Sequence, residues 1–236
     1  MAESGRRQFV KYSFFKVDPA WRRLPEELRF ESKRNFAQAV TKISEEMFTR
    51  SFSLVGMRGD SDFFLQQAAD TLEEIQDSAV RLWSTDLGAY LTQPHSYLAM
   101  TRLSEYVGKG KHEHEGQEGT GTRIRPVDAK YFIVYPFLKT REWYLLPQEE
   151  RQNIMNGHIT VGHKYPSVKI NTTYSFGLDD QEFVVGFETD NPGDFLDLVM
   201  DLRTTRSSLY TLRDTPIFTG IHKTIEDTLD DLGGRP

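Results

Sequence analysis

Two segments of the chain share an uncommon pattern, and this internal repeat restricts the possible folds more than any other feature. WRRLPEELR begins at Trp21 and WYLLPQEER begins at Trp143, so both follow W-x-x-L-P-x-E-x-R at a separation of 122 residues. A stretch rich in β-forming residues precedes each segment, at 9–17 and 130–139. The repeat therefore predicts that one structural unit occurs twice in the chain.

The residues after each repeat also follow one order. Pro25 and Pro147 suit the first turn of a helix, where the missing N–H costs no hydrogen bond. After the first helix we expect strands at 50–57 and 62–69, a helix from 70 and a strand at 95–103. After the second we expect strands at 167–176 and 182–189, a helix from 190 and a strand at 215–222. Each half then reads β-α-β-β-α-β, the ferredoxin-like order.

These elements predict an α+β fold made of tandem ferredoxin-like halves, a dimeric α/β-barrel arrangement within one chain. We expect an N-terminal half at 1–106, a linker loop at 107–129 and a C-terminal half at 130–236. The linker is rich in Gly and charge and shows no periodicity. Long loops of this kind are either mobile connections or lids and binding loops, and both interpretations stay open.

Charge and composition exclude several classes of function. The net charge of −6 argues against a protein that binds nucleic acid through a basic surface. Because the chain has no cysteine, disulfides, thiolate catalysis and iron–sulfur clusters are excluded. No segment approaches the ~20 apolar residues of a membrane span, and the first residues hold no apolar signal sequence. We therefore expect a cytoplasmic enzyme or binding protein.

Histidines are the remaining candidates for metal chemistry. His158 and His163 would lie about 140° apart around a continuous helix, so they cannot easily share one ion. His158 lies near the end of an amphipathic helix, where it could interact with the helix dipole or serve as a single axial ligand to haem iron. His112 and His114 lie in the linker, where such charged runs are commonly just solvated.

Four segments of the sequence resemble the chlorite dismutase-like haem protein family, and within it the coproheme decarboxylases. The segments are SYLAMTRLSEY (96–106), YPFLKTREWYLLPQEER (135–151), HITVGHKYPSVKINTTYSFGLDDQEF (158–183) and LRTTRSSLYTLRDTPIFTG (202–220). The resemblance implies two ferredoxin-like halves, a homopentamer, and peroxide-dependent conversion of iron coproporphyrin III (coproheme) to haem b. It also implies that His158 is the proximal iron ligand.

The resemblance assigns roles to three further residues near the second repeat. Tyr135 corresponds to a tyrosine that forms a phenoxyl radical and removes hydrogen from a propionate, after which CO2 leaves. Lys139 corresponds to a lysine that holds or polarises this propionate, and Trp143 to a tryptophan beside the porphyrin. Propionate contacts are expected from Tyr106, Arg125, Arg203 and Ser208.

The residue on the distal side of the iron separates the activities of the family. Alignment backwards from GLDD places Ile170 there, whereas alignment forwards from His158 places Asn171, and we favour Ile170. A slip of one residue reverses which side chain faces the pocket. Neither residue is arginine, so chlorite dismutation is disfavoured. With an aliphatic distal residue, His114 is the expected base for peroxide.

Two other functions stay open. The chain could be a haem-binding carrier or sensor without decarboxylase activity, or an α/β protein that binds no cofactor at all.

Overall fold

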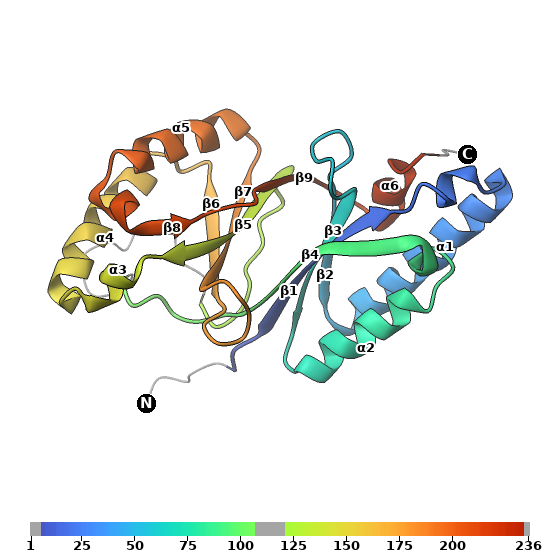
Figure 1. The fold of residues 1–236 in the computed structure, drawn as a ribbon, viewed down its shortest axis with the longest axis horizontal. Coiled ribbons are helices and arrows are strands. Elements are labelled where there is room, and N and C mark those ends of the chain that lie inside the picture. The colour runs from blue at the N-terminus through green and yellow to red at the C-terminus, as the bar shows by residue number, and fades with distance from the viewer. Residues whose placement is uncertain (1–5, 107–120, 234–236) are drawn as a thin grey trace. The chain divides into compact units, whose positions relative to one another are not determined.

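The computed structural model describes residues 6–106 and 121–233 of the chain. These residues fall into two units (Figure 1). The N-terminal unit consists of residues 6–98 and 218–233, and the C-terminal unit of residues 99–106 and 121–217.

The N-terminal unit holds a five-stranded sheet in the order β4-β1-β3-β2-β9. Its elements are β1 (Phe9–Val17), α1 (Glu26–Glu46), β2 (Phe48–Ser53), β3 (Phe63–Ala69), α2 (Leu72–Trp83), β4 (Leu91–Met100), β9 (Phe218–Lys223) and α6 (Ile225–Asp230). β1 pairs antiparallel with β3 from Phe9↔Ala69 to Phe15↔Phe63. The first four strands therefore have the ferredoxin-like order 4-1-3-2.

Helices α1 and α2 lie side by side on one face of this sheet (Figure 1). Phe15 and Phe63 of the sheet stack with ring centroids 5.0 Å apart, and Phe36 of α1 meets both edge-on. α2 begins with a capping box, in which the Thr71 hydroxyl accepts from Glu74 N while the Glu74 carboxylate accepts from Thr71 N. This box satisfies backbone donors that a helix end otherwise leaves unpaired.

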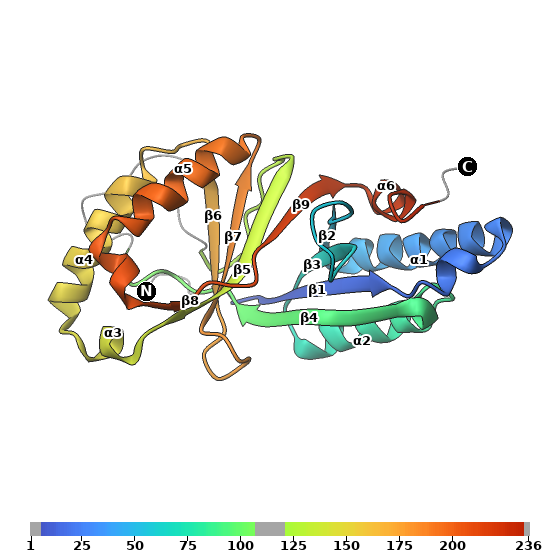
Figure 2. The ribbon, with the colours of Figure 1, turned by 45° about the horizontal axis from the view of Figure 1, so that its top comes forward.

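The C-terminal unit repeats the arrangement with the strand order β6-β7-β5-β8. Its elements are β5 (Tyr131–Lys139), α3 (Arg141–Leu145), α4 (Gln148–Gly162), β6 (Lys169–Tyr174), β7 (Phe183–Thr189), α5 (Pro192–Arg203), the 3-10 helix η3 (Arg206–Tyr210) and β8 (Thr211–Arg213). α4 and α5 lie side by side over one face of this sheet (Figure 2). Pro147 immediately precedes α4, as the repeat predicts.

The last strand differs from the sequence prediction. The expected strand at 215–222 would close the C-terminal half, but the short strand β8 already pairs with β5 there, with Leu138↔Arg213 and Lys139↔Thr211. β9 instead pairs antiparallel with β2, from Ser51↔Lys223 to Ser53↔Ile221. The predicted boundary of 130–236 thus differs from the observed packing, because residues 218–233 belong with the N-terminal unit.

β9 belongs to the N-terminal unit because its apolar residues pack against that unit. Phe218 is fully buried, with its ring centroid 4.0 Å from that of Phe14. Gly220 lies so close to Phe64 that a Cβ at this position would be 2.6 Å from the ring. The side chains that bury β9 are therefore those of the N-terminal unit.

None of the helices within 6–106 and 121–233 is both long enough and apolar enough to cross a membrane.

Candidate functional site

The sheet of the C-terminal unit determines which predicted residues share a face. In the register, Tyr135 lies opposite Val185, and Val185 lies opposite Thr172. Directly opposed residues of antiparallel strands point to the same face, and residues two apart on a strand do so too. Ile170 therefore shares a face with Tyr135. This face packs against α4 and α5, since Val185 belongs to a cluster with Leu198.

Asn171 points to the opposite face of β6. Its side chain is 4% exposed, and its Nδ2 donates to Oε1 of the buried Glu188 at 3.0 Å. Ile170 is 41% exposed and so keeps apolar surface uncovered on the Tyr135 face. The register thus selects Ile170 over Asn171 as the residue that shares the helix-covered face with Tyr135.

His158 lies on α4 and contacts the start of the 3-10 helix η3. Its Nδ1 is 3.0 Å from Oγ of Ser207, a serine that is 4% exposed. Burial, together with the nearby charge of Lys139, lowers the pKa of His158 to about 4. The imidazole is therefore neutral at pH 7. Within the described part of the chain no hydrogen bond engages its Nε2, so this atom is available to a metal.

Lys139 ends β5 beside the same serine. The side chain is 9% exposed, its Nζ donates to the Ser207 carbonyl at 3.3 Å, and its Nζ lies 4.4 Å from the centroid of the Trp143 ring. Burial lowers the pKa of Lys139 to about 8, against the opposing attraction of Glu182. Three residues predicted separately, Lys139, Trp143 and His158, are thus brought together around Ser207.

Trp143 connects this cluster to Tyr106, another residue that the family resemblance predicts to be in the site. It is 2% exposed, and its ring centroid is 6.2 Å from that of Tyr106 and 5.4 Å from that of Tyr210. The backbone carbonyl of Tyr106 accepts from Gln152 of α4 at 3.2 Å. Burial raises the pKa of the Tyr106 phenol. Tyr106 therefore belongs to the aromatic side of the cluster.

Tyr135 lies near a different pair of charges. Burial raises the pKa of its phenol, the charge of Asp214 raises it further, and Arg203 acts in the opposite direction. Arg203 is exposed and forms an ion pair with Asp214. The Ser208 hydroxyl donates to the carbonyls of Arg203 and Thr205, at 2.9 and 2.8 Å. The structure thus places Arg203 and Ser208 together, with the charge of Arg203 near the Tyr135 phenol.

The remaining predicted residues stay predictions. Arg125 is exposed on the segment before β5. His112 and His114 lie outside the described residues.

The sequence did not single out Ser207 or Glu182. Ser207 stands beside the predicted Ser208, and nothing in RSSLY indicates which serine faces His158. Glu182 is 7% exposed and accepts from the backbone N–H of Lys139 at 2.8 Å and from the Tyr144 hydroxyl at 2.6 Å. In the sequence, Glu182 could have been noticed only as a charged residue at the edge of the strand that LDDQEF leads into.

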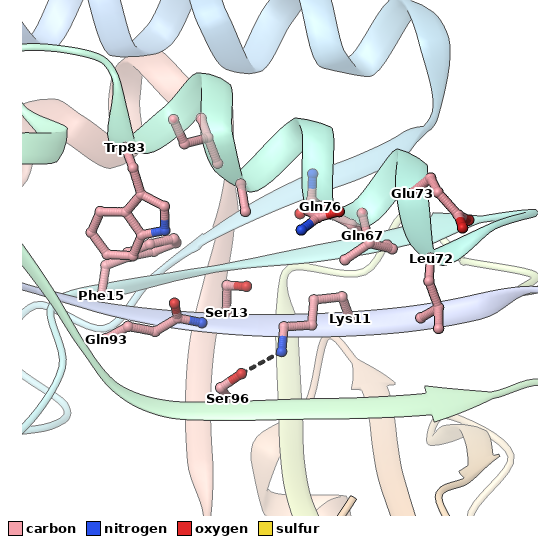
Figure 3. Close-up of a pocket in the computed structure, with 13 residues that line it drawn as sticks. Lys11, Ser13, Phe15, Gln67, Leu72, Glu73, Gln76, Trp83, Gln93 and Ser96 are labelled. Carbon is pink, nitrogen blue, oxygen red and sulfur yellow. Dashed lines mark hydrogen bonds between the residues drawn. The ribbon is translucent and has the colours of Figure 1, made fainter. Parts of the chain in front are cut away.

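A separate cavity of about 380 Å³ lies in the N-terminal unit, between α2 and the sheet (Figure 3). Its lining residues are Lys11, Ser13, Phe15, Gln67, Leu72, Glu73, Ile75, Gln76, Ala79, Leu82, Trp83, Gln93 and Ser96. On the sheet side of this cavity, Lys11 of β1 donates to the Ser96 hydroxyl of the neighbouring strand β4 (Figure 3). Since this lining includes no His, Cys, Met or Tyr, it offers no usual axial ligand for haem iron. His158 of the C-terminal unit, in contrast, carries an imidazole, which is a usual axial ligand for haem iron.

A sequence profile described as "Chlorite dismutase" matches residues 29–223, most of the chain. The chain belongs to the chlorite dismutase family. The family resemblance and the fold class expected from the sequence are thereby confirmed.

Two named proteins are similar to this family member in sequence. The chain is 31% identical over 186 residues to the coproheme decarboxylase of Mycolicibacterium smegmatis, which covers 77% of this chain and 75% of that protein. It is 30% identical over 232 residues to a putative heme-binding protein of Natronomonas pharaonis. That alignment covers 90% of this chain and 38% of the longer relative.

Solved structures agree with the fold. Chlorite dismutase from Candidatus Nitrospira defluvii in complex with imidazole is 28% identical, with a TM-score of 0.86, and the match covers 97% of this chain and 95% of that chain. A heme-binding protein from Thermus thermophilus is 22% identical with a TM-score of 0.81, covering 95% and 94%, and shows likeness of fold alone.

Proposed function

We propose that this chlorite dismutase family member binds iron coproporphyrin III through His158 and uses hydrogen peroxide to decarboxylate two propionates, giving haem b. The observation that carries the proposal is the neutral His158 imidazole, whose Nδ1 is engaged by Ser207 while its Nε2 is available. One axial imidazole is the arrangement found in haem proteins that leave the other iron face open. The coproheme decarboxylase among the relatives supports the choice of substrate.

Each decarboxylation has a fixed balance. One propionic acid side chain and one hydrogen peroxide give one vinyl group, one CO2 and two H2O. The bound iron supplies the oxidising chemistry with peroxide. The protein has to hold the propionate, pass on a hydrogen atom and keep water away from the reacting carbon.

Tyr135 and Lys139 are the proposed catalytic residues. The buried phenol of Tyr135 has a raised pKa, so it stays protonated at pH 7 and retains the hydrogen atom needed for one-electron chemistry. The Lys139 ammonium, whose pKa of about 8 keeps it mainly charged at pH 7, can pair with a propionate. His114 is proposed as the base that accepts the first proton of peroxide.

The rim of the site is proposed to bind the four carboxylates of coproheme. Arg203, Ser208, Tyr106 and Arg125 supply cations and hydroxyls for this purpose, while Trp143 and Ile170 contact the porphyrin. Loss of the Arg203–Asp214 ion pair would free the guanidinium for a propionate. We further propose that the protein is cytoplasmic and works as a homopentamer.

The test is to add coproheme to the purified protein and then titrate hydrogen peroxide. A shift and sharpening of the coproheme Soret band upon mixing reports binding, and mass spectrometry follows the porphyrin. Stepwise loss of two carboxyl groups supports the proposal. Binding without that loss would support the second candidate, a haem-binding protein without decarboxylase activity, which the Natronomonas relative and the apolar Ile170 favour. A Soret band unchanged from that of free coproheme would overturn both.

A further inference from the structure

Two hydroxyl side chains between α5 and η3, those of Thr205 and Ser207, connect His158 to a backbone carbonyl through a continuous chain of hydrogen bonds. His158 Nδ1 lies 3.0 Å from Ser207 Oγ, and Ser207 Oγ lies 2.8 Å from Thr205 Oγ1. Thr205 Oγ1 in turn lies 2.7 Å from the backbone carbonyl oxygen of Leu202. Each link has the length of a normal hydrogen bond.

The Leu202 carbonyl at the end of this chain determines which atom donates and which accepts in each hydrogen bond. A carbonyl oxygen can only accept, so Thr205 must donate its one hydroxyl proton to Leu202. Thr205 Oγ1 therefore has no proton left for Ser207, and Ser207 has to donate to it. Ser207 Oγ then faces His158 as an acceptor. The bond between them requires a proton on Nδ1 of His158.

We propose that Thr205 and Ser207 are positioning residues that select one tautomer of His158, with the proton on Nδ1 and the lone pair on Nε2. A neutral imidazole binds a metal through the nitrogen that carries no proton, and the hydrogen bond at the other nitrogen fixes this choice. Toward iron, the inference rests on the function proposed above. The tautomer itself is a property of the protein without any cofactor.

The surroundings hold this chain in place. Ser207 is 4% exposed, so water does not compete for its hydroxyl. Lys139 at the end of β5 donates to the Ser207 carbonyl at 3.3 Å, which ties the 3-10 helix to the sheet. Leu202 lies in the last turn of α5, and its carbonyl oxygen also accepts from the backbone N–H of Thr205 at 3.1 Å. The acceptor at the end of the chain is thus a fixed backbone group.

Thr205→Val is the decisive variant, because it keeps the shape of the side chain and removes the hydroxyl. Ser207 then loses its acceptor at position 205 and can donate to His158 Nδ1, which moves the imidazole proton to Nε2. The measurement is 15N NMR of histidine-labelled protein without cofactor, with the His158 signals identified by their loss in His158→Gln. We expect protonated Nδ1 in the wild type and protonated Nε2 in Thr205→Val.

Two controls separate this effect from general damage. Thr205→Ser retains a hydroxyl and should restore protonated Nδ1. Thr204→Val removes a hydroxyl that donates to a different carbonyl, Asp201 O at 2.7 Å, and should leave His158 unchanged. If Thr205→Val misfolds, Ser207→Ala serves instead and should give a mixture of both tautomers. Protonated Nδ1 as the sole form in Thr205→Val or Ser207→Ala would overturn the inference.

Binding of coproheme gives a second readout. Thr205→Val should weaken the affinity for coproheme about 10-fold or more, as loss of a supporting hydrogen bond to a ligating histidine commonly does. If the tautomer changes in Thr205→Val but neither variant nor wild type binds coproheme, the inference stands and the proposed function fails. If coproheme binds equally well and the tautomer is unchanged, the function stands and the inference fails.

Discussion

At the scale of single residues, the site depends on groups whose charge is suppressed by burial. His158 is neutral because burial and Lys139 disfavour its protonated form, and Tyr135 is neutral because burial and Asp214 disfavour its ionised form. Both effects come from neighbours that are distant in the sequence. The two residues can therefore act as a lone-pair donor and a hydrogen-atom donor at the same pH.

Tyr135→Phe tests the second of these roles. The variant keeps the ring and its contact with Phe187, at 5.8 Å between centroids, so we expect coproheme binding to be retained. Without the phenolic hydrogen, decarboxylation under peroxide should fall at least 100-fold, as measured by mass spectrometry of the porphyrin. Tyr131→Phe removes a hydroxyl from the same face of the same strand and should keep full activity. Decarboxylation at the wild-type rate in Tyr135→Phe would contradict the radical role.

A second residue-scale prediction concerns acid stability of the N-terminal unit. Arg58 donates to Asp60 from Nε at 2.8 Å, and His95 Nε2 lies 2.9 Å from the same carboxylate. The Arg58 hydrogen bond lowers the pKa of Asp60 far below its usual range, with His95 adding to the effect. The folded state therefore favours ionised Asp60 above the unfolded pKa of about 3.9, and this stabilisation is lost as the pH falls below it.

Asp60→Asn should accordingly lower the denaturation midpoint at pH 7, with the difference from wild type shrinking below about pH 4. Urea titrations at several pH values measure this. Glu45→Gln, which removes one exposed negative charge from α1, controls for net charge. A difference independent of pH would contradict the assignment.

At the scale of elements, the neighbouring residues Ile170 and Asn171 of strand β6 lie on opposite faces of the sheet and have different surroundings. Asn171 supports the fold, because its amide pairs with the buried Glu188, whereas Ile170 leaves apolar surface on the face shared with Tyr135. Alternation along a strand puts these neighbours on opposite faces. The same strand thus contributes to the core on one side and to the candidate site on the other.

Paired alanine substitutions test this division. Asn171→Ala should lower the free energy of unfolding by about 1–3 kcal/mol, because it leaves a Glu188 oxygen without its amide donor. Ile170→Ala should cost less than about 1 kcal/mol, because the side chain is largely exposed, but should shift the Soret band of the coproheme complex. Denaturant titration and absorption spectra distinguish the two. The reverse pattern would place Asn171 in the site.

At the scale of the whole molecule, the two units do not coincide with the two sequence repeats. β9 follows the second repeat in the chain but extends the sheet beside β2, and α6 packs against α1. Lys33 of α1, 4% exposed, forms an ion pair with Asp230 at 2.6 Å. The last described residues of the chain are therefore part of the N-terminal core.

Gly220→Ala tests this exchange. The new methyl group would meet the Phe64 ring at 2.6 Å and Phe52 Cβ at 2.9 Å, so we expect a loss of about 1–3 kcal/mol from overpacking. Native-state hydrogen exchange should show faster exchange in β2 and β3, with β6 and β7 unaffected. Gly59→Ala is the matched control, because a Cβ there meets no atom within 4 Å. Faster exchange confined to β6 and β7 would refute the placement of β9.

The sequence by itself determined the α+β class and the repeated ferredoxin-like order, because hydrophobic periodicity and the W-x-x-L-P-x-E-x-R repeat are local patterns. It indicated the family through four segments that resemble it. It also selected His158, Tyr135, Lys139 and Trp143 through the family resemblance, and the structure brings three of these together around Ser207. Their proposed roles stay predictions.

Tertiary structure alone decided three things. It assigned β9 to the N-terminal unit, because the aromatic side chains that bury Phe218 and Gly220 lie far earlier in the chain. It put Ile170, and not Asn171, on the face shared with Tyr135, because a sheet register is fixed by pairing between strands. It identified Ser207 and Thr205, because the direction of a hydrogen-bonded chain depends on which acceptor lies at its end.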